Sequence, residues 1–498
     1  MAAPTPPFPG PSRIAAKALC ALLIGGCASL PERASIAHAG PVRSNVEWVQ
    51  KVDVRGADGP LGPRSKARLL AEGASPARRD DLARHLAALE LNVPGERGQD
   101  AWQTGNQVKL LIDGPATLGA MFQAIEGATQ SVLLESYILE DDEVAQQLAT
   151  LLKRKAAQGV KAVVIYDGVG SIATSNAFFD DLKRAGVPSC AFNPVNPLKR
   201  PGYWGISHRD HRKILAVDGH TAFTGGINIS RVYASSSFGR GRAQKLIEER
   251  ARQDQAEGRD SKTDGWRDTQ IQIRGPAAQT FDTLVRDTWR QQGCQGDLPP
   301  TVPYQAPPVD PKQHTPASLL RVLPAGPDDG PSRIYTALLA AIEHARESVQ
   351  LTMAYFAPGR EMLDALEDAA RRGVKVQLVL PSISDFSPVL YAGRATYTEL
   401  LEAGVELYEL QDALLHAKTG VVDGVWSTVG SSNMDWRSFV SNNEANIVVL
   451  DEGVAGDMQR AFAQDVSRSQ RITREAWRGR GVLERAKEWG AGLFSRWF

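Results

Sequence analysis

The sequence has no excess of charge of either sign, few cysteines and no long hydrophobic run. Its 498 residues include 57 lysines and arginines and 57 aspartates and glutamates, so the formal net charge is zero. Capture of a nucleic acid needs a surplus of positive charge, which argues against a generic polyanion binder. No run of about 18 apolar residues occurs, so no ordinary transmembrane helix is expected. The length and a hydrophobic content of 42% nevertheless suffice for a large buried core.

Two of the four cysteines lie within the first 27 residues. Arg13 and Lys17 precede a short apolar stretch, which ends in small residues before Cys27. A basic region, an apolar core and small residues form the pattern of a secretory signal. The ending LIGGC is similar to the lipobox of bacterial lipoproteins, with Cys27 as the lipidated residue. We therefore expect a membrane-anchored bacterial lipoprotein that faces the periplasm or the cell exterior; an ordinary signal peptide is the alternative.

The other two cysteines, Cys190 and Cys294, leave their redox state open. A chain exported to an oxidising compartment can form one disulfide between them. Two unpaired, buried thiols fit the sequence at least as well.

The hydrophobic pattern indicates an internal duplication. From residue 107, strand-like alternation gives way to helical spacing, and the two patterns continue to alternate, which predicts α/β lobes. The first half contains, in order, SVLL at 131, GVK at 159 and LKRAGV at 182; the second half repeats this order with SVQL at 348, GVK at 373 and LLEAGV at 400. Similar elements in one order, twice, are typical of a duplicated unit.

The predicted organisation follows from this duplication and from changes in composition. Residues 28–104 are polar and contain one expected helix near 80–91. Residues 298–318 are rich in proline, and the polar segment 239–264 is expected to be a solvated helix or loop. The predicted segments are a signal peptide (1–27), an N-terminal lead-in (28–104), a first lobe (105–297), a linker (298–318), a second lobe (319–470) and a basic aromatic tail (471–498).

The tail interleaves aromatic and basic residues. Trp477, Trp489, Leu493 and the aromatic residues after them alternate with arginines and a lysine. A short basic aromatic helix suits a membrane interface. Packing against the core of the protein is the alternative, and the sequence does not decide between them.

One chemical motif occurs twice with the same spacing. In both copies a lysine follows the histidine by two residues, an aspartate by seven and an asparagine by seventeen. The first copy is His211, Lys213, Asp218 and Asn228, and the second is His416, Lys418, Asp423 and Asn433. A neutral imidazole can attack phosphorus, while an ammonium and an amide bind the nonbridging oxygens. If His and Lys share one strand, both side chains leave the same face, so two facing copies would surround one phosphate.

Two further carboxylates accompany the motifs. Asp268 and Glu444 each begin an alternating strand after one of the copies. A nucleophilic histidine needs an acceptor on its second nitrogen, so we expect each carboxylate to orient one histidine; strand-end solvation is the alternative. Seven residues of extended chain span about 20 Å, so Asp218 and Asp423 suit a turn or a salt bridge better than a base. His208 and His211 have no further ligand at metal-binding spacing, and no metal site is expected.

These motifs resemble the phospholipase D superfamily, whose hallmark is a duplicated HKD motif, and in particular bacterial cardiolipin synthases. The resemblance extends over roughly residues 105–480 and includes HRKILAVDGHTAFTGGINIS, GWRDTQIQIRGPA, TMAYFAPGREMLDAL and LLHAKTGVVDGVWSTVGSSNMDWRSF. It implies an α/β fold with two pseudo-symmetric phospholipase D-like α/β/α lobes that share one central active-site cleft. The best-known synthases begin with two transmembrane helices, whereas this chain begins with the lipobox-like signal.

The resemblance also implies a mechanism without a metal or organic cofactor. One histidine attacks the phosphodiester to form a phosphohistidine, and the other protonates the leaving alcohol. By position we expect His211 to be the nucleophile and His416 the general acid, although near-symmetry permits the reverse. The motif places the lysines and aspartates, Lys213, Lys418, Asp218 and Asp423, in the catalytic set, with Asn228 and Asn433 as phosphate ligands.

The expected reaction is phosphatidyl transfer between phosphatidylglycerol and a second phospholipid, which is either the phosphatidyl donor or the acceptor, giving cardiolipin. Phosphatidylethanolamine is a candidate second substrate, and the expected partners are phospholipids and a membrane, without nucleic acid, for a monomer with both motifs in one chain. Hydrolysis to phosphatidic acid is the alternative, since it shares the first half-reaction. The neutral charge argues against a nuclease, and the intact motifs argue against a catalytically inactive scaffold.

Overall fold

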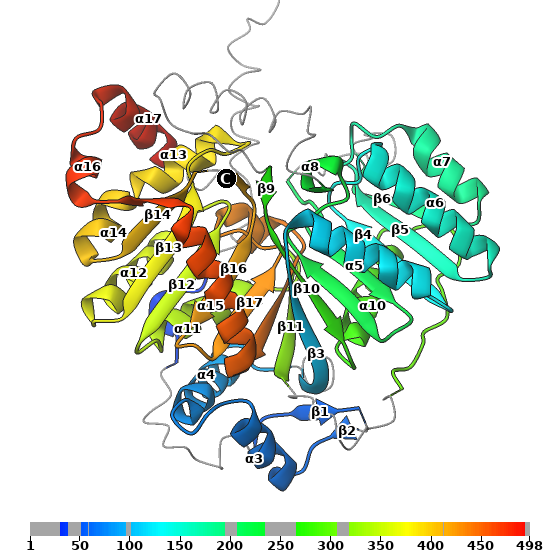
Figure 1. Ribbon diagram of the computed structural model, residues 1–498, viewed down its shortest axis with the longest axis horizontal. Coiled ribbons are helices and arrows are strands. Elements are labelled where there is room, and N and C mark those ends of the chain that lie inside the picture. The colour runs from blue at the N-terminus through cyan, green and yellow to red at the C-terminus, as the bar shows by residue number, and fades with distance from the viewer. Residues whose placement is uncertain are drawn as a thin grey trace, which may run out of the picture.

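The computed structural model describes residues 30–37, 51–57, 59–95, 101–194, 207–234, 265–305, 318–411 and 413–493. The predicted signal with Cys27 and the polar segment 239–264 lie outside these residues. Figure 1 shows two α/β lobes side by side, with smaller N-terminal elements at one end. The fold is the predicted pairing of two α/β lobes.

The first lobe is built on a mixed sheet with helices on both faces. Leu133 and Leu134 are neighbours on one buried strand but join different core clusters, because successive side chains leave a strand on opposite faces. Across the sheet the strands are β3 (Trp102–Ile112), β10 (Thr269–Arg274), β8 (Thr221–Gly225), β7 (Lys213–Val217), β4 (Ser131–Ser136), β5 (Lys161–Asp167) and β6 (Ser189–Phe192). The helices are α5 (Asp113–Gly127), α6 (Glu143–Ala157), α7 (Asn176–Arg184), α8 (Arg231–Ala234) and α10 (Ala278–Gln291).

The second lobe repeats this strand order, which confirms the duplication. Its strands are β11 (Ser318–Ala325), β18 (Glu444–Leu450), β17 (Trp426–Gly430), β16 (Lys418–Val422), β12 (Ser348–Met353), β13 (Lys375–Pro381), β14 (Glu406–Leu410) and the additional β19 (Ser469–Ile472). Its helices are α11 (Arg333–Glu343), α12 (Arg360–Arg371), α13 (Ser387–Ala395), α14 (Tyr397–Ala403), α15 (Glu452–Ser467), α16 (Arg474–Arg478) and α17 (Val482–Gly492), with a π-helical turn at Arg437–Ser441.

The lobes share a sheet and a core. Strand β11 pairs antiparallel with β3, which joins the two sheets edge to edge. Between the lobes, one cluster of buried side chains takes Phe281 and Val285 from α10 together with Val421 and Ile447 from the second lobe. The short strands β9 (Trp266–Arg267) and β15 (Leu414–Leu415) also pair across the lobes. The mutual placement of the two motifs is therefore fixed by apolar packing and by backbone hydrogen bonds.

The N-terminal lead-in is packed onto the second lobe. The predicted helix at 80–91 is α4 (Arg79–Asn92), whose Leu82, Leu86 and Leu89 are buried in the core of that lobe and which packs against α11. The sequence pattern did not predict helix α3 (Pro63–Glu72), the strands β1 (Val54–Gly56) and β2 (Gly59–Pro60), or a short 3-10 turn at Arg33–Ser35. Most side chains of α3 are exposed, whereas α4 is buried from Asp81 to Leu89, with its polar side chains included.

Two predicted boundaries differ from the structure. Strand β3 begins at Trp102, inside the segment predicted as lead-in, because the buried indole of Trp102 is part of the second lobe's core. Strand β19 crosses the predicted start of the tail at 471 and pairs with β14. The tail therefore starts as an edge strand of the second lobe.

The structure also decides the state of the two remaining cysteines. Cys190 on β6 and Cys294 after α10 form a disulfide with a Cα–Cα distance of 5.7 Å. Among the described residues, none of the helices has both the length and the apolar character needed to cross a membrane.

Candidate active site

The two motif histidines lie just before their strands, on backbone held by the opposite lobe. His211 N donates to the carbonyl oxygen of Asn443 at 2.9 Å, and His416 N donates to that of Arg267 at 2.8 Å. Strands β7 and β16 begin only at Lys213 and Lys418, so the expected His-x-Lys pair on one strand is wrong. Instead, each lysine ammonium donates to the backbone carbonyl of its own motif histidine.

One cleft of about 360 Å³ brings the two motifs together. His211 and Asn228 of the first lobe line it together with His416 and Asn433 of the second. The two lysines lie behind this lining and are almost fully buried. Both histidines line the same cleft, so the two copies of the motif form one site.

Each histidine is paired with a carboxylate from the other lobe. His211 Nδ1 lies 3.1 Å from Oε1 of Glu444, and His416 Nδ1 lies 2.7 Å from Oδ2 of Asp268. Both carboxylates are completely buried. Since an ionised carboxylate only accepts, Glu444 holds the proton of a neutral His211 on Nδ1 and leaves the Nε2 lone pair of His211 free for chemistry. Asp268 contacts His416 at the equivalent nitrogen. The predicted carboxylates therefore contact the histidines, and the pairing crosses the lobe interface.

The two carboxylates differ in their surroundings. Ser431 Oγ donates to Glu444, whereas the equivalent position in the first motif is Gly226, which has no hydroxyl. A Cβ at Gly226 would come 2.1 Å from Oδ1 of Asp268, so only glycine leaves room for this carboxylate. A hydrogen bond to the charged form stabilises that form. Glu444 has one from the Ser431 hydroxyl, whereas Asp268 Oδ1 accepts from the backbone N–H of Thr269 at 2.7 Å.

The pKa values follow from these surroundings. Burial raises the pKa of Asp268 to about 7, despite the nearby charge of Lys418. Burial also opposes ionisation of Glu444, but the charge and hydrogen bond of His211 and the Ser431 hydroxyl prevail and lower its pKa. Burial lowers the pKa of both histidines, that of His416 strongly. It also lowers the pKa of the ammonium groups, to about 7 for Lys213 and about 8 for Lys418.

The two candidate phosphate-binding amides are not equivalent. Asn228 Oδ1 accepts from Ile138 N at 3.1 Å, and its Nδ2 donates to Tyr233 Oη at 2.9 Å. Within the described part of the chain, Asn433 Oδ1 has no hydrogen-bond partner, although Asn433 is buried in the cleft wall. Asn433 is therefore the amide better placed to reorient toward a ligand.

Aromatic side chains form walls that pattern reading did not identify. Tyr137 meets the ring of His211 edge-on at 5.0 Å, and Trp266 meets that of His416 at 5.1 Å. Tyr233 and Tyr355 also line the cleft. Two of these have a sequence signal, since Trp266 stands two residues before Asp268 and Tyr355 lies in TMAYFAPG, but chain position alone does not show that they face the histidines.

The aspartates of the two motifs lie outside the cleft, which corrects their placement in the catalytic set. Asp218, with a positive φ of 50°, accepts from the backbone N–H groups of Thr129, Gln130 and Ser131 at 2.7 to 2.9 Å. Asp423 has the same φ and accepts from the N–H groups of residues 346–348. Each carboxylate caps the turn that enters a central strand, about 16 Å along the strand from its motif lysine.

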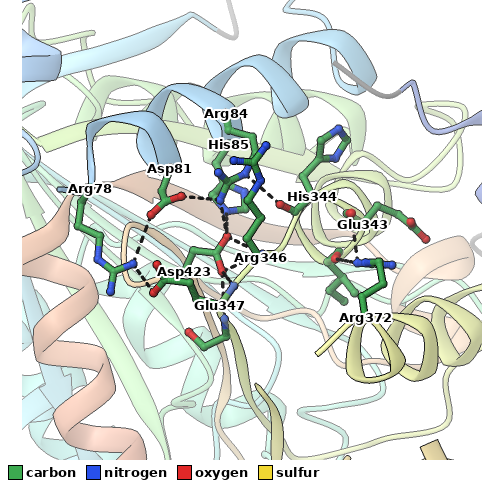
Figure 2. Close-up of polar contacts among 12 residues, drawn as sticks. Arg78, Asp81, Arg84, His85, Glu343, His344, Arg346, Glu347, Arg372 and Asp423 are labelled. Carbon is green, nitrogen blue, oxygen red and sulfur yellow. Dashed lines mark hydrogen bonds and ion pairs between the residues drawn. The ribbon is translucent and has the colours of Figure 1, made fainter. Parts of the chain in front are cut away.

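In the second lobe the lead-in adds an ion network to this turn. Figure 2 shows Arg84 and His85 of α4 reaching Asp423, with Arg84 Nη2 2.7 Å and His85 Nε2 3.0 Å from its Oδ2. Arg84 Nε also donates to the carbonyl oxygen of His344 at 3.0 Å. These side chains are buried, so the hydrogen bonds among them are made in a low dielectric. The network attaches α4 to the second motif's far end and serves the fold rather than the chemistry.

Comparison with known proteins gives the family. The family model described as "Cardiolipin synthase, PLD-like domain" matches residues 121–238 and 338–466, so each match contains one motif histidine. The chain is 33% identical over 398 residues to the cardiolipin synthase of Geobacillus kaustophilus, an alignment that spans 80% of this chain and 74% of that protein. The chain belongs to the cardiolipin synthase family. It is thus an enzyme of the phospholipase D superfamily.

Other similarities agree with this membership. Cardiolipin synthase A of Pseudomonas aeruginosa is 31% identical over 370 residues, covering 74% of this chain and 69% of that protein. The solved structure of phosphatidylserine synthase from Haemophilus influenzae has a TM-score of 0.50 at 12% identity and covers 78% of this chain and 95% of its own. That structural likeness shows the fold alone. Among the described residues of this cardiolipin synthase family member, no three His, Cys, Asp or Glu side chains are grouped as a metal ion requires.

Proposed function

We propose that this enzyme makes cardiolipin by transferring a phosphatidyl group from phosphatidylglycerol, or from another donor phospholipid, to the headgroup hydroxyl of phosphatidylglycerol. The observation that carries the proposal is the pair of histidines in one cleft, each held by a buried carboxylate of the other lobe. The names of the relatives, cardiolipin synthases over most of the chain, support the same reaction.

The proposed reaction has two half-reactions at one phosphorus. His211 Nε2 attacks the phosphorus of the donor, the bond to the headgroup oxygen breaks, and His416 gives that oxygen a proton, so glycerol leaves. The phosphatidyl group is then bound to His211 through a P–N bond. His416, now neutral, takes the proton of the acceptor's headgroup hydroxyl as that oxygen attacks phosphorus. The P–N bond breaks, and cardiolipin and the original His211 are formed.

The different surroundings of the carboxylates support these roles. An ionised Glu444 beside His211 stabilises the positive charge that the imidazole gains when it bonds to phosphorus. The pKa of Asp268 near 7 means that the Asp268–His416 pair holds a proton in the neutral range and can supply it to a leaving alcohol. The charge and hydrogen bond of His211 and the charge of Lys213 lower the pKa of Glu444, and the Ser431 hydroxyl, which Gly226 lacks, adds to this difference.

Product analysis separates transfer from hydrolysis. Purified full-length protein is incubated with labelled phosphatidylglycerol, with and without phosphatidylethanolamine, and the lipids are resolved. We expect labelled cardiolipin together with free glycerol, in agreement with the names of the relatives. Phosphatidic acid as the only labelled product would instead establish a hydrolase, and the absence of both products would exclude both reactions. A product that requires phosphatidylethanolamine would identify the second substrate.

We also propose that the enzyme is a lipoprotein anchored through Cys27 and exposed to the periplasm or cell exterior. The Cys190–Cys294 disulfide supports export, because such bonds persist in oxidising compartments. Mass spectrometry of the mature protein from a bacterial host should find an acylated N-terminal cysteine, and Cys27→Ala should release unacylated protein. Unchanged processing and membrane attachment of Cys27→Ala would contradict the lipid anchor. Because one chain supplies both motifs, we propose that a monomer suffices for activity and that no nucleic acid is bound.

A further inference from the structure

Helix α17 carries its large apolar side chains on the side that faces away from the protein. Val482, Trp489 and Leu493 are 82%, 71% and 62% exposed. They stand at positions i, i+7 and i+11, so they share one face of the helix. Glu488 is only 3% exposed, and its carboxylate accepts from Arg480 Nε at 2.8 Å. The helix thus buries an acidic residue and exposes its apolar stripe, the reverse of an ordinary surface helix.

The packing of α17 on α13 explains this orientation. The contact uses the small side chain of Ala491, which packs against a buried cluster that includes Val389 and Ala392 of α13. Trp477, by contrast, is buried against Tyr397, with ring centroids 4.9 Å apart. The tail therefore divides into a part that packs on the core, through Trp477, and a helix whose apolar stripe packs on nothing in the described chain. Exposed apolar surface of this kind marks an interaction site.

Apart from this stripe, the exposed large hydrophobic residues lie on α17 itself or close in sequence to residues that line the active-site cleft. In the described part of the chain they are Leu483 on α17, Phe386 at 42% and Ile172 at 72% exposure. Phe386 immediately precedes α13 and lines the cleft on the second lobe's side. Ile172 lies two residues after Gly170, which lines the cleft on the first lobe's side. Figure 1 shows α17 and α13 at the same end of the molecule as β9, which carries the cleft residue Trp266.

The charge of this region indicates the occupant. Residues 474–493 contain five basic and three acidic side chains, and one of the acidic ones is the buried Glu488. Arg478 and Lys487 are 74% and 42% exposed at the side chain, and Arg485 is also exposed. An apolar helix face flanked by basic residues binds a bilayer surface that contains anionic lipid.

We propose that the outward face of α17, together with Phe386 and Ile172 at the cleft rims, docks on an anionic phospholipid bilayer and turns the cleft toward the headgroups. The proposal deepens the proposed function, since a phospholipid substrate resides in such a surface. The apolar side chains enter the interface between headgroups and acyl chains, and the basic side chains meet lipid phosphates. Substrates then reach His211 and His416 without leaving the bilayer completely.

Vesicle flotation tests this docking without any turnover. The full chain carries Cys27→Ala, so that no lipid anchor contributes, and is mixed with vesicles of phosphatidylglycerol and phosphatidylcholine or of phosphatidylcholine alone. In this background Trp489→Ser with Leu493→Ser is compared with Trp489→Phe and Leu493→Met, which keep the face apolar. We expect the serine variant to bind the anionic vesicles at least about tenfold more weakly than the parent, and the apolar variant within about twofold.

The other outcomes also decide the matter. Equal vesicle binding by the serine variant and the parent would overturn the proposal. So would a parent that does not bind vesicles but forms a dimer that the serine variant abolishes, because the face would then be a contact between copies of the chain. Turnover of a water-soluble short-chain phosphatidylglycerol should be the same in all variants. If the parent fails on that substrate, the proposed function fails, while the flotation result still decides the docking surface.

Discussion

Alanine at either His211 or His416 is expected to lower kcat by at least about 10³-fold while the chain stays folded. Both imidazoles line the cleft. In the proposed mechanism one of them bonds to phosphorus and the other transfers the proton. The measurement is the release of glycerol and formation of cardiolipin from phosphatidylglycerol, with thermal unfolding followed in parallel. Turnover within about tenfold of the wild type for both variants would overturn the mechanism.

A donor whose leaving group needs no proton distinguishes the two histidines. With a p-nitrophenyl ester of phosphatidic acid, His416→Ala should still release p-nitrophenolate in a first turnover and retain a phosphatidyl group on His211. His211→Ala should do neither. The opposite result, with the label on His416, would reverse the assignment of nucleophile and general acid.

Asp268→Asn and Glu444→Gln are expected to lower kcat by about 10² to 10⁴-fold without lowering the melting temperature in the same proportion. An amide can donate to Nδ1 and so favours the wrong imidazole tautomer, with the proton on Nε2. Asp268→Asn is expected to lower activity without lowering the free energy of unfolding. The pKa of Asp268 rises from 3.8 to about 7 on folding. Ionising this buried carboxylate therefore destabilises the folded protein, and the free energy of unfolding falls as the pH rises through that interval. At pH 8 Asp268→Asn should therefore be at least as stable as the wild type.

The pH profile adds a readout that a merely structural role would not move. The wild type should lose activity above about pH 7, as the Asp268–His416 pair and the Lys213 ammonium lose their protons, and Asp268→Asn should remove the part of this limb that the pair contributes. Ser431→Ala should raise the pKa of Glu444, because it removes the hydroxyl that stabilises the ionised carboxylate. Full turnover with Glu444→Gln would contradict its role in positioning His211.

Asp423→Asn is the matched control, since this carboxylate lies outside the cleft. Breaking a buried pair with Arg84 and His85 costs about 3 to 5 kcal/mol of unfolding free energy, so the melting temperature should fall. The pKa of Asp423 is lowered in the fold despite its burial, with His85 the principal favourable partner, so this stability is lost as the pH falls toward the acid range. The remaining folded protein should keep a normal kcat.

The periodicity of the sequence predicted the duplication because strand order and helix spacing are local properties that each half repeats. The sequence also predicted helix α4. It missed α3, which begins at Pro63, because most of that helix is polar and exposed and only Lys66 and Leu69 are buried. It misplaced each histidine on the same strand as its lysine because the strand begins two residues later, where backbone pairing within the sheet starts.

The contacts that build the site join residues that are far apart in the chain. His211 and Glu444 are 233 positions apart, and His416 and Asp268 are 148 apart. Sequence spacing proposed all four residues but not their crossed pairing, because the lobe interface brings them together. The same holds for Asp423, whose partners Arg84 and His85 come from a segment with no motif of its own.

The sequence by itself determined the chemistry that is available: two histidines, two lysines and two amides at matched spacing in a duplicated α/β chain. Residue identity and local spacing suffice for that, since they specify which groups exist and how often. Only the tertiary structure decided which carboxylate serves which histidine, that the motif aspartates cap turns, that Cys190 and Cys294 pair, and that Trp477 is buried while Trp489 faces outward. These depend on which surfaces are covered when the lobes and the tail pack, and burial is a property of the whole fold rather than of any segment.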